Sequence, residues 1–329
     1  RISKENRKIT NEIEKKRNRK NIPESEYITT MKNPENVVEF DNVHTYFFTD
    51  IGTVKAVDGV SFSVEKGRIL GIVGESGCGK SVTSMSILQL LGSNARISGG
   101  SIKLDGKELI GLPEKEMCRI RGNDIAMIFQ DPMTALNPTL TIGTQLMEPI
   151  MLHQNCGKKE AWTRAVDVLK RVGIAAPEKR MKEYPHQLSG GMRQRVMIAM
   201  AVSCEPRLLI ADEPTTALDV TIQAQILELM CELREKMGTA IMLITHDMGV
   251  VAETADDVLV LYAGKAVEYG SIEDIFERPK HPYTQGLLNS IPRLDEDVEL
   301  LNTIEGTVPA PDAMPAGCRF APRCPYGKD

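Results

Sequence analysis

The pattern of hydrophobic and polar positions divides the chain into strand-like and helix-like stretches. Between Val37 and Val64, β-branched and aromatic residues recur, and turn residues near positions 50, 52 and 59 interrupt them. This pattern predicts an antiparallel β layer, to which residues 101–106 add a further hairpin strand. Short continuous apolar runs predict strands buried on both faces of a second sheet. These runs are residues 68–73, 125–129, 207–212, 239–245 and 258–262.

Helical spacing predicts helices over residues 80–91, 147–153 and 160–172, and a helix that Ser189 caps and that runs to Ser203. Strands that alternate with helices indicate an α/β fold with a mainly parallel sheet. Residues 131–205 are then a helical insertion between two halves of that sheet. After Gly270 the periodicity weakens and proline becomes frequent, so we expect an extended C-terminal extension over 271–329.

Composition narrows the class of protein. The 329 residues are 42% hydrophobic, and 40 Lys and Arg against 45 Asp and Glu give a net charge of −5, which argues against a nucleic-acid partner. The longest apolar runs cover about five residues, whereas a membrane span needs about 20. Seven scattered cysteines indicate a reducing, cytoplasmic setting.

The first 30 residues have the opposite charge. They hold nine Lys and Arg against five Glu and have no aromatic residue before Tyr27, which predicts a solvated, disordered basic arm. A plausible start at Met31 just precedes the first strand-like run, so residues 1–33 are either such an arm or non-native upstream sequence. The main domain is then 34–270.

Residues 74–81, Gly-Glu-Ser-Gly-Cys-Gly-Lys-Ser, fit the phosphate-binding pattern G-x4-G-K-[ST] between a predicted strand and a predicted helix. Glycines allow successive backbone N–H groups to point at phosphate, and the helix N-terminus adds positive potential. Lys80 can reach the β- and γ-phosphates, and the Ser81 hydroxyl can bind Mg²⁺. The positive potential also predicts a lowered pKa for the Cys78 thiol.

Two further motifs extend this chemistry. The strand 208–212 ends in Asp212-Glu213, and neighbouring side chains at a strand end point in different directions. Asp212 is therefore assigned to Mg²⁺ and Glu213 to positioning or deprotonating water. Residues 188–195, Leu-Ser-Gly-Gly-Met-Arg-Gln-Arg, place adjacent glycines at a predicted helix N-terminus, which is a second anion-binding device.

The order of these motifs resembles the nucleotide-binding domain of ABC transporters, a P-loop NTPase fold. Gln130 resembles the Q-loop glutamine, Ala217-Leu218-Asp219 the D-loop, and His246 the switch histidine that contacts the γ-phosphate. Phe47, with Tyr46 as the alternative, is similar to the aromatic residue that stacks on adenine. The resemblance implies an ATPase with catalytic residues Lys80, Glu213 and His246, and Mg²⁺ ligands Ser81, Gln130 and Asp212.

In that family two domains face head to tail, and each closes the other's nucleotide site. The resemblance therefore implies that Ser189, Gly190 and Gly191 serve the ATP of a partner ATPase, either a paralogous subunit or a second copy. The implied ATP-binding residues of this chain are Phe47, Gly74, Glu75, Ser76, Gly77, Cys78, Gly79, Lys80, Ser81, Val82, Gln130, Ser189, Gly190, Gly191 and Asp219.

Residues 71–77, 129–138, 184–189, 279–284, 290–294 and 317–325 resemble the oligopeptide/dipeptide importer branch. That branch implies an ATPase at the cytoplasmic face of the membrane, a translocase working with two transmembrane permease subunits and an extracytoplasmic substrate-binding protein. Import of nickel or another small solute is the first alternative. A non-transport ABC ATPase is the second, although the long heptad segments of the DNA-repair type are missing here.

Cys318 and Cys324 form a C-x5-C pair in the extension. The importer branch resembles proteins that hold a 4Fe-4S cluster there, but such clusters normally need four thiolates. Either further ligands lie outside this sequence or no cluster forms. The spacing disfavours zinc, whose usual pattern is C-x2–4-C.

Overall fold

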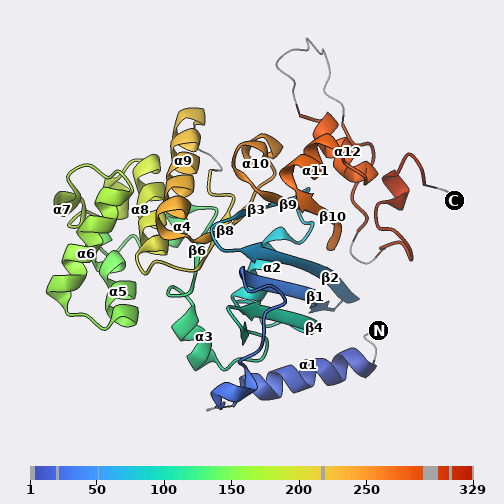
Figure 1. Cartoon of the computed structure of the whole chain (residues 1–329), viewed down its shortest axis with the longest axis horizontal. Helices are drawn as coiled ribbons and strands as arrows, with labels where there is room; N and C mark the ends of the chain where they lie inside the picture. The colour runs from blue at the N-terminus through green and yellow to red at the C-terminus, as the bar shows by residue number, and fades with distance from the viewer. Residues whose placement is uncertain are drawn as a thin grey trace, which may run out of the picture. The chain divides into compact units, whose positions relative to one another are not determined.

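The computed structural model describes residues 4–19, 22–50, 52–215, 219–291, 303–310 and 313–327. The chain folds as two compact units, the first made of residues 1–117 and 243–329 and the second of residues 118–242 (Figure 1).

The strands are β1 (Asn36–Thr49), β2 (Gly52–Glu65), β3 (Ile69–Val73), β4 (Ala95–Leu104), β5 (Lys107–Glu108), β6 (Ile125–Ile128), β7 (Leu208–Asp212), β8 (Ala240–Ile244), β9 (Asp257–Tyr262) and β10 (Lys265–Ser271). The helices are α1 (Lys4–Arg17), α2 (Lys80–Ile87), α3 (Glu114–Ile120), α4 (Pro132–Ala135), α5 (Ile142–Gln154), α6 (Lys158–Arg171), α7 (Pro177–Arg180), α8 (Gly190–Val202), α9 (Val220–Met237), α10 (Met248–Thr254), α11 (Ile272–Glu277) and α12 (Pro282–Asn289).

The first unit contains the predicted antiparallel layer, a sheet with the strand order β2-β1-β4-β5. The two short runs expected at its start form one long strand, β1, which pairs with β2 on one side and β4 on the other. The register shifts between Phe40 and Val43, where Asn42 has φ +46°. Such a bulge lets one strand continue across a local irregularity in the hydrophobic pattern.

The first unit also carries the strands that lead into the phosphate-binding motif. Strand β3 pairs in parallel with β9, and β9 pairs antiparallel with β10. All five residues of β3 are buried, as its unbroken apolar run predicts. The end of β8 lies against β3, where the Thr245 N–H donates to the Ile72 carbonyl over 3.2 Å. After β10 the chain forms α11 and α12, so the start of the extension is helical rather than extended.

The second unit holds the predicted helical insertion. Strands β6 and β7 are parallel neighbours, and α4, α5, α6, α7 and α8 lie between them along the chain. Helix α6 buries Ala161, Ala165 and Leu169 at four-residue spacing, which packs one face of the helix inward. Ser189 is the N-cap of α8, and its hydroxyl accepts from the Met192 N–H over 3.4 Å.

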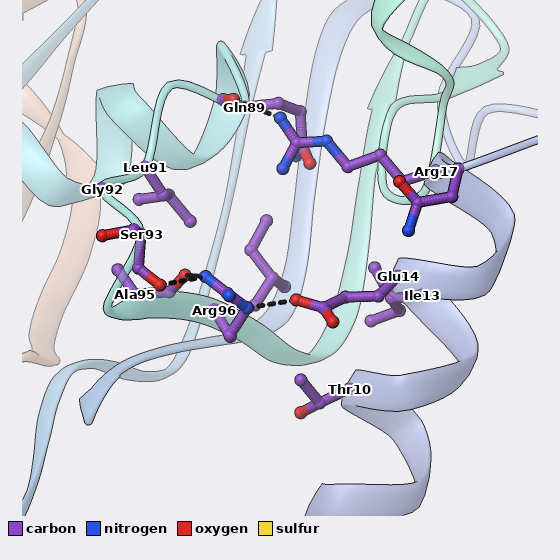
Figure 2. Close-up of a pocket in the computed structure, with 12 residues that line it drawn as sticks. Thr10, Ile13, Glu14, Arg17, Gln89, Leu91, Gly92, Ser93, Ala95 and Arg96 are labelled. Atoms are coloured by element: carbon purple, nitrogen blue, oxygen red, sulfur yellow. Dashed lines mark hydrogen bonds and ion pairs between the residues drawn. The ribbon is translucent and has the colours of Figure 1, made fainter.

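The N-terminal segment differs from the expected disordered arm, because residues 4–17 form helix α1 beside β4 (Figure 2). Arg17 donates to the Gln89 carbonyl over 3.0 Å, and Arg96 of β4 pairs with Glu14. These side chains line a groove of about 350 Å³ between α1 and β4. Composition indicated solvation, but the ion pair to β4 and the hydrogen bond to the Gln89 carbonyl, just after α2, give this basic helix a folded position.

Residues just before β1 also join the first sheet. The Thr29 N–H donates to the Gly106 carbonyl over 2.6 Å, and the Glu108 N–H donates to the Tyr27 carbonyl over 2.8 Å. The boundary expected at residue 33 therefore does not separate an unstructured arm from the fold. Among the described residues, none of the helices combines the length and apolar character that a bilayer span requires.

Asp58 of β2 connects the first sheet to the C-terminal extension. Its carboxylate accepts hydrogen bonds from the Tyr46 hydroxyl over 2.7 Å and from Arg319 of the extension over 2.5 Å, and Lys265 lies 3.3 Å away. Burial alone would raise the pKa of Asp58, but the bonds from Tyr46 and His44 and the charges of Lys265 and Arg319 outweigh it. The pKa falls from 3.8 to about 2.

Because the folded pKa is depressed, Asp58 contributes stability above pH 3.8 that is lost as the pH falls through 2. We expect Asp58→Asn to lower the free energy of unfolding by about 2–4 kcal/mol at pH 7, since it also weakens the pairing of buried Arg319. The deficit should shrink below pH 4 in urea titrations at stepped pH. The matched control Asp167→Asn, in an exposed pair with Lys170, should change stability by less than about 1 kcal/mol. A deficit that does not depend on pH would contradict this account.

Candidate nucleotide-binding site

The predicted phosphate-binding loop lies between β3 and α2, as its mechanism requires. Gly74, Gly77 and Gly79 have φ of +148°, +77° and +106°, conformations that side chains rarely permit. A Cβ on Gly74 would lie 2.1 Å from the Leu261 carbonyl oxygen, and one on Gly79 would lie 2.4 Å from the Ala56 carbonyl oxygen. The loop is therefore packed backbone against backbone at both ends.

Lys80 begins α2 and lies inside the curve of the loop. Its ammonium donates to the Gly74 carbonyl over 2.6 Å and to the Glu75 carbonyl over 3.3 Å, and the residue is only 7% exposed. Ser76, Gly77 and Ser81 are exposed and Val82 is half-buried. A helix N-terminus, a positive side chain and an exposed glycine-rich turn suit a polyphosphate anion, so the residues present fit ATP.

The structure overturns the expectation of an activated thiol at Cys78. The residue is 1% exposed, and burial raises the pKa of its thiol, although the Lys80 charge acts in the opposite direction. Desolvation of a thiolate outweighs the attraction of one ammonium here. Cys78 fills space under the loop, and its sulfur would lie 2.7 Å from a Cβ on Gly74.

Two residues that sequence reasoning missed hold Glu75, the second residue of the loop. The Glu75 N–H donates to the Tyr283 hydroxyl over 2.9 Å, and the Glu75 carboxylate pairs with Arg323 at 2.7 and 3.1 Å. Tyr283 and Arg323 follow the loop by more than 200 residues. Both lie in segments that resemble the importer branch, residues 279–284 and 317–325, but nothing in those segments pointed to Glu75.

The remaining candidates of the first unit are Phe47 and His246. Tyr46, the alternative for stacking on adenine, is 4% exposed, and its hydroxyl donates to Asp58. Phe47 is half-buried and so more accessible than Tyr46, which favours it over Tyr46. His246 is exposed and lies two residues after the end of β8 at Ile244, just before Asp247, which caps α10 through the Gly249 N–H at 2.8 Å.

In the second unit the structure brings Gln130 and Glu213 together. The Gln130 amide donates to the Glu213 carboxylate over 2.9 Å. Glu213 has φ +47°, which costs a non-glycine residue about 1–2 kcal/mol. Asp212 ends the fully buried strand β7 and is 8% exposed. A strained backbone at a residue such as Glu213, just after the end of β7, is typical of functional sites.

The Ser189 segment lies in the same unit at the start of α8. Ser189 and Gly190 are exposed, and a Cβ on Gly191 would lie 3.3 Å from the Ile222 side chain of α9. Asp219 caps α9 by accepting from the Ile222 N–H over 3.0 Å. Ala217 and Leu218 of the predicted D-loop lie outside the described residues, as does most of 290–294.

The structure gives no support to an iron–sulfur cluster. Cys318 is exposed and Cys324 is half-buried. In the part of the chain that the structure describes, no group of three or more His, Cys, Asp or Glu residues is arranged to hold a metal ion. Two tail cysteines do not meet the ligand number of a 4Fe-4S cluster, so we derive no chemistry from one.

Comparison with known proteins places this geometry in a family. Residues 57–216 match the family model "ABC transporter", and residues 267–329 match "Oligopeptide/dipeptide transporter, C-terminal region". The chain is 58% identical to oligopeptide transport ATP-binding protein AppD of Bacillus subtilis, covering 89% of this chain and 90% of the relative. The chain belongs to the ATP-binding subunits of ABC transporters.

Further relatives support the same membership. This ABC subunit is 52% identical to oligopeptide transport ATP-binding protein OppD of Salmonella typhimurium, over 93% of this chain and 91% of the relative. Among solved structures, the ATP-binding cassette MJ0796, a dimer in a post-hydrolysis state bound to ADP and Pi, superposes with a TM-score of 0.64. The two sequences are 28% identical, and the match covers 71% of this chain and 98% of the MJ0796 chain. The fold prediction and the ATPase assignment are confirmed.

The close packing of the loop gives a direct test. We expect Gly74→Ala to lower the free energy of unfolding by about 3 kcal/mol, because the added Cβ forces an unfavourable φ and a clash. Urea denaturation without nucleotide measures this. Gly317→Ala is the matched control, since a Cβ there meets no atom within 4 Å, and its effect should stay within about 0.5 kcal/mol. Equal stability of the two variants would contradict the packing argument.

Proposed function

We propose that this ABC subunit hydrolyses ATP to power the import of dipeptides or oligopeptides. The observation that carries the proposal is the match of residues 267–329 to the oligopeptide/dipeptide C-terminal region, together with relatives named for transport of those solutes. The subunit works at the cytoplasmic face of the membrane. Its partners are two permease subunits, an extracytoplasmic binding protein and a second ATPase subunit.

The phosphate-binding loop grips the triphosphate. Backbone N–H groups from Gly77 to Ser81 and the Lys80 ammonium balance the phosphate charge, and Phe47 stacks on adenine. Lys80 donates to carbonyls of its own loop, so its ammonium lies inside the loop where the β- and γ-phosphates bind. That preorganisation lowers the cost of ordering the loop on binding.

Ser81, Gln130 and Asp212 are the proposed ligands of Mg²⁺, and the bound ion neutralises charge on the phosphates. Glu213 orients the attacking water and accepts its proton. The Gln130–Glu213 hydrogen bond holds that carboxylate in one direction, and His246 contacts the γ-phosphate. The assignment of residues from both units to one nucleotide rests on motif order and family membership.

Ser189, Gly190 and Gly191 serve the nucleotide of the partner ATPase in a head-to-tail pair. The helix N-terminus that they form offers N–H groups to an anion, and Ser189 and Gly190 are exposed. Neither subunit surrounds the γ-phosphate alone, so ATP holds the pair together and hydrolysis releases it. Gln130 and the segment 131–138 then couple this closing and opening of the ATPase pair to the permeases.

The function is tested in proteoliposomes that contain the complete complex, with a dipeptide and its binding protein inside and Mg-ATP outside. Peptide should stimulate hydrolysis, and Glu213→Gln should lower kcat about 10²–10⁴-fold because the general base is lost. ATP affinity should stay within about threefold of wild type. Glu178→Gln, at an exposed pair with Lys170, should retain full turnover. Stimulation by nickel but not by peptides would overturn the peptide assignment.

The partner role of Ser189 is tested separately in the Glu213→Gln background, where ATP is bound but not turned over. Ser189→Arg should leave ATP binding by the isolated chain within about twofold, but raise the dissociation constant of the ATP-dependent pair at least about tenfold, because a bulky cation fills the partner's site. Ser189→Thr preserves the helix cap and should pair normally. Light scattering after size exclusion measures pairing, and normal pairing of Ser189→Arg would refute the role.

A further inference from the structure

The C-terminal extension reaches the phosphate-binding loop through two side chains, Tyr283 and Arg323, and Arg323 is the one that binds the Glu75 carboxylate. The Arg323 side chain is 3% exposed, and its guanidinium pairs in a two-pronged geometry with the half-buried Glu75 carboxylate, at 2.7 and 3.1 Å. We propose that Arg323 is a positioning residue for ATP binding, which acts by fixing Glu75 and with it the first turn of the loop. The inference rests on the proposed function and adds a residue outside the family's nucleotide-binding motifs.

Every part of the Arg323 guanidinium has a partner. Its Nε donates to the Glu305 carbonyl over 2.9 Å, and one terminal nitrogen also donates to the Ile304 carbonyl over 3.0 Å. The other also approaches the Tyr262 hydroxyl at the end of β9, at 3.5 Å. Since the planar fork is held by backbone carbonyls on one side, the side chain cannot swing away from Glu75 without losing several bonds.

Aromatic rings complete the support. The guanidinium carbon lies 5.9 Å from the ring centroids of both Tyr262 and Phe320. Tyr262, Tyr283 and Phe320 form a buried cluster with centroids 4.6 to 5.4 Å apart. This cluster also fixes the Tyr283 hydroxyl, which accepts from the Glu75 N–H over 2.9 Å. The extension therefore holds Glu75 by its backbone and by its side chain.

The position of Glu75 matters because its carbonyl organises the loop. That oxygen accepts from the Cys78 N–H over 3.2 Å and from the Lys80 ammonium over 3.3 Å. If Glu75 rotates, the turn that presents the following N–H groups and the ammonium loses its anchor. An unpaired Glu75 carboxylate would also repel the phosphates. Both effects weaken binding of the nucleotide rather than the chemical step.

The test is a double-mutant cycle on the full-length chain, read by binding of a fluorescent ATP analogue and by steady-state ATPase of the complete complex. Arg323→Ala should raise the ATP dissociation constant and KM about tenfold with kcat changed less than about twofold, given the strength of a partly buried bidentate pair. In a Glu75→Ala background the same substitution should cost less than about twofold, because Arg323 acts through Glu75.

Two further variants separate positioning from bulk stability. Arg323→Lys keeps the charge and the apolar stem but not the fork, so it should fold normally and still raise KM about threefold. Arg278→Ala removes an exposed arginine that pairs with Asp274 at 2.7 Å in the same unit, and it should leave both constants unchanged. The melting temperature of each variant is measured alongside.

The outcomes distinguish this inference from the proposed function. If wild type binds and hydrolyses ATP but Arg323→Lys and Arg323→Ala match it, the positioning role is wrong and the proposed function stands. Equal losses with and without Glu75 also overturn the role, because they indicate general loosening of the extension. If wild type itself neither binds nor hydrolyses ATP, the proposed function fails first.

Discussion

The structure depends on the close approach of the phosphate-binding loop to the backbone of neighbouring strands, with no side chains between them. At Gly74 and Gly79 the phosphate-binding loop packs against the carbonyls of Leu261 and Ala56. These contacts come from β9, which is far from the loop in sequence, and from β2, the strand before β3. The Gly264 N–H, just after β9, adds a hydrogen bond to the Cys78 carbonyl over 2.8 Å. The shape of the loop is therefore set by the sheets around it, and glycine is the residue that this closeness permits.

The C-terminal extension packs into the same unit as the phosphate-binding loop and takes part in holding it. Arg319 of the extension donates to the Ala263 carbonyl and to Asp58, beside the same β9–β10 turn that contacts the loop. Arg323, four residues later, binds Glu75. The segment that carries the oligopeptide-type sequence thus contacts the loop region at three points, through the supporting turn by Arg319 and directly by Arg323 and Tyr283.

Local pattern predicted the parts of this fold that depend on short-range rules. Continuous apolar runs identified β3 and β7, alternation identified the antiparallel layer, and Ser189 was correctly expected to cap a helix. Helix α1 was missed because its stability comes from pairs with distant residues such as Arg96, which composition does not report. The pKa of Cys78 was predicted with the wrong sign, since a motif indicates the nearby charge but not the burial.

The candidate site shows the same division between local and distant information. Motif spacing predicted the loop and the position of Glu213. It did not predict that Glu213 has φ +47° or that Gln130 donates a hydrogen bond to its carboxylate. A sequence motif specifies which groups are available, whereas strain and hydrogen bonds specify where they point. Glu75 is the clearest case, because the pattern G-x4-G-K-[ST] leaves its position open to any residue. In this chain the open position is a glutamate, and its carboxylate is the group that Arg323 of the extension binds at the edge of the phosphate-binding loop.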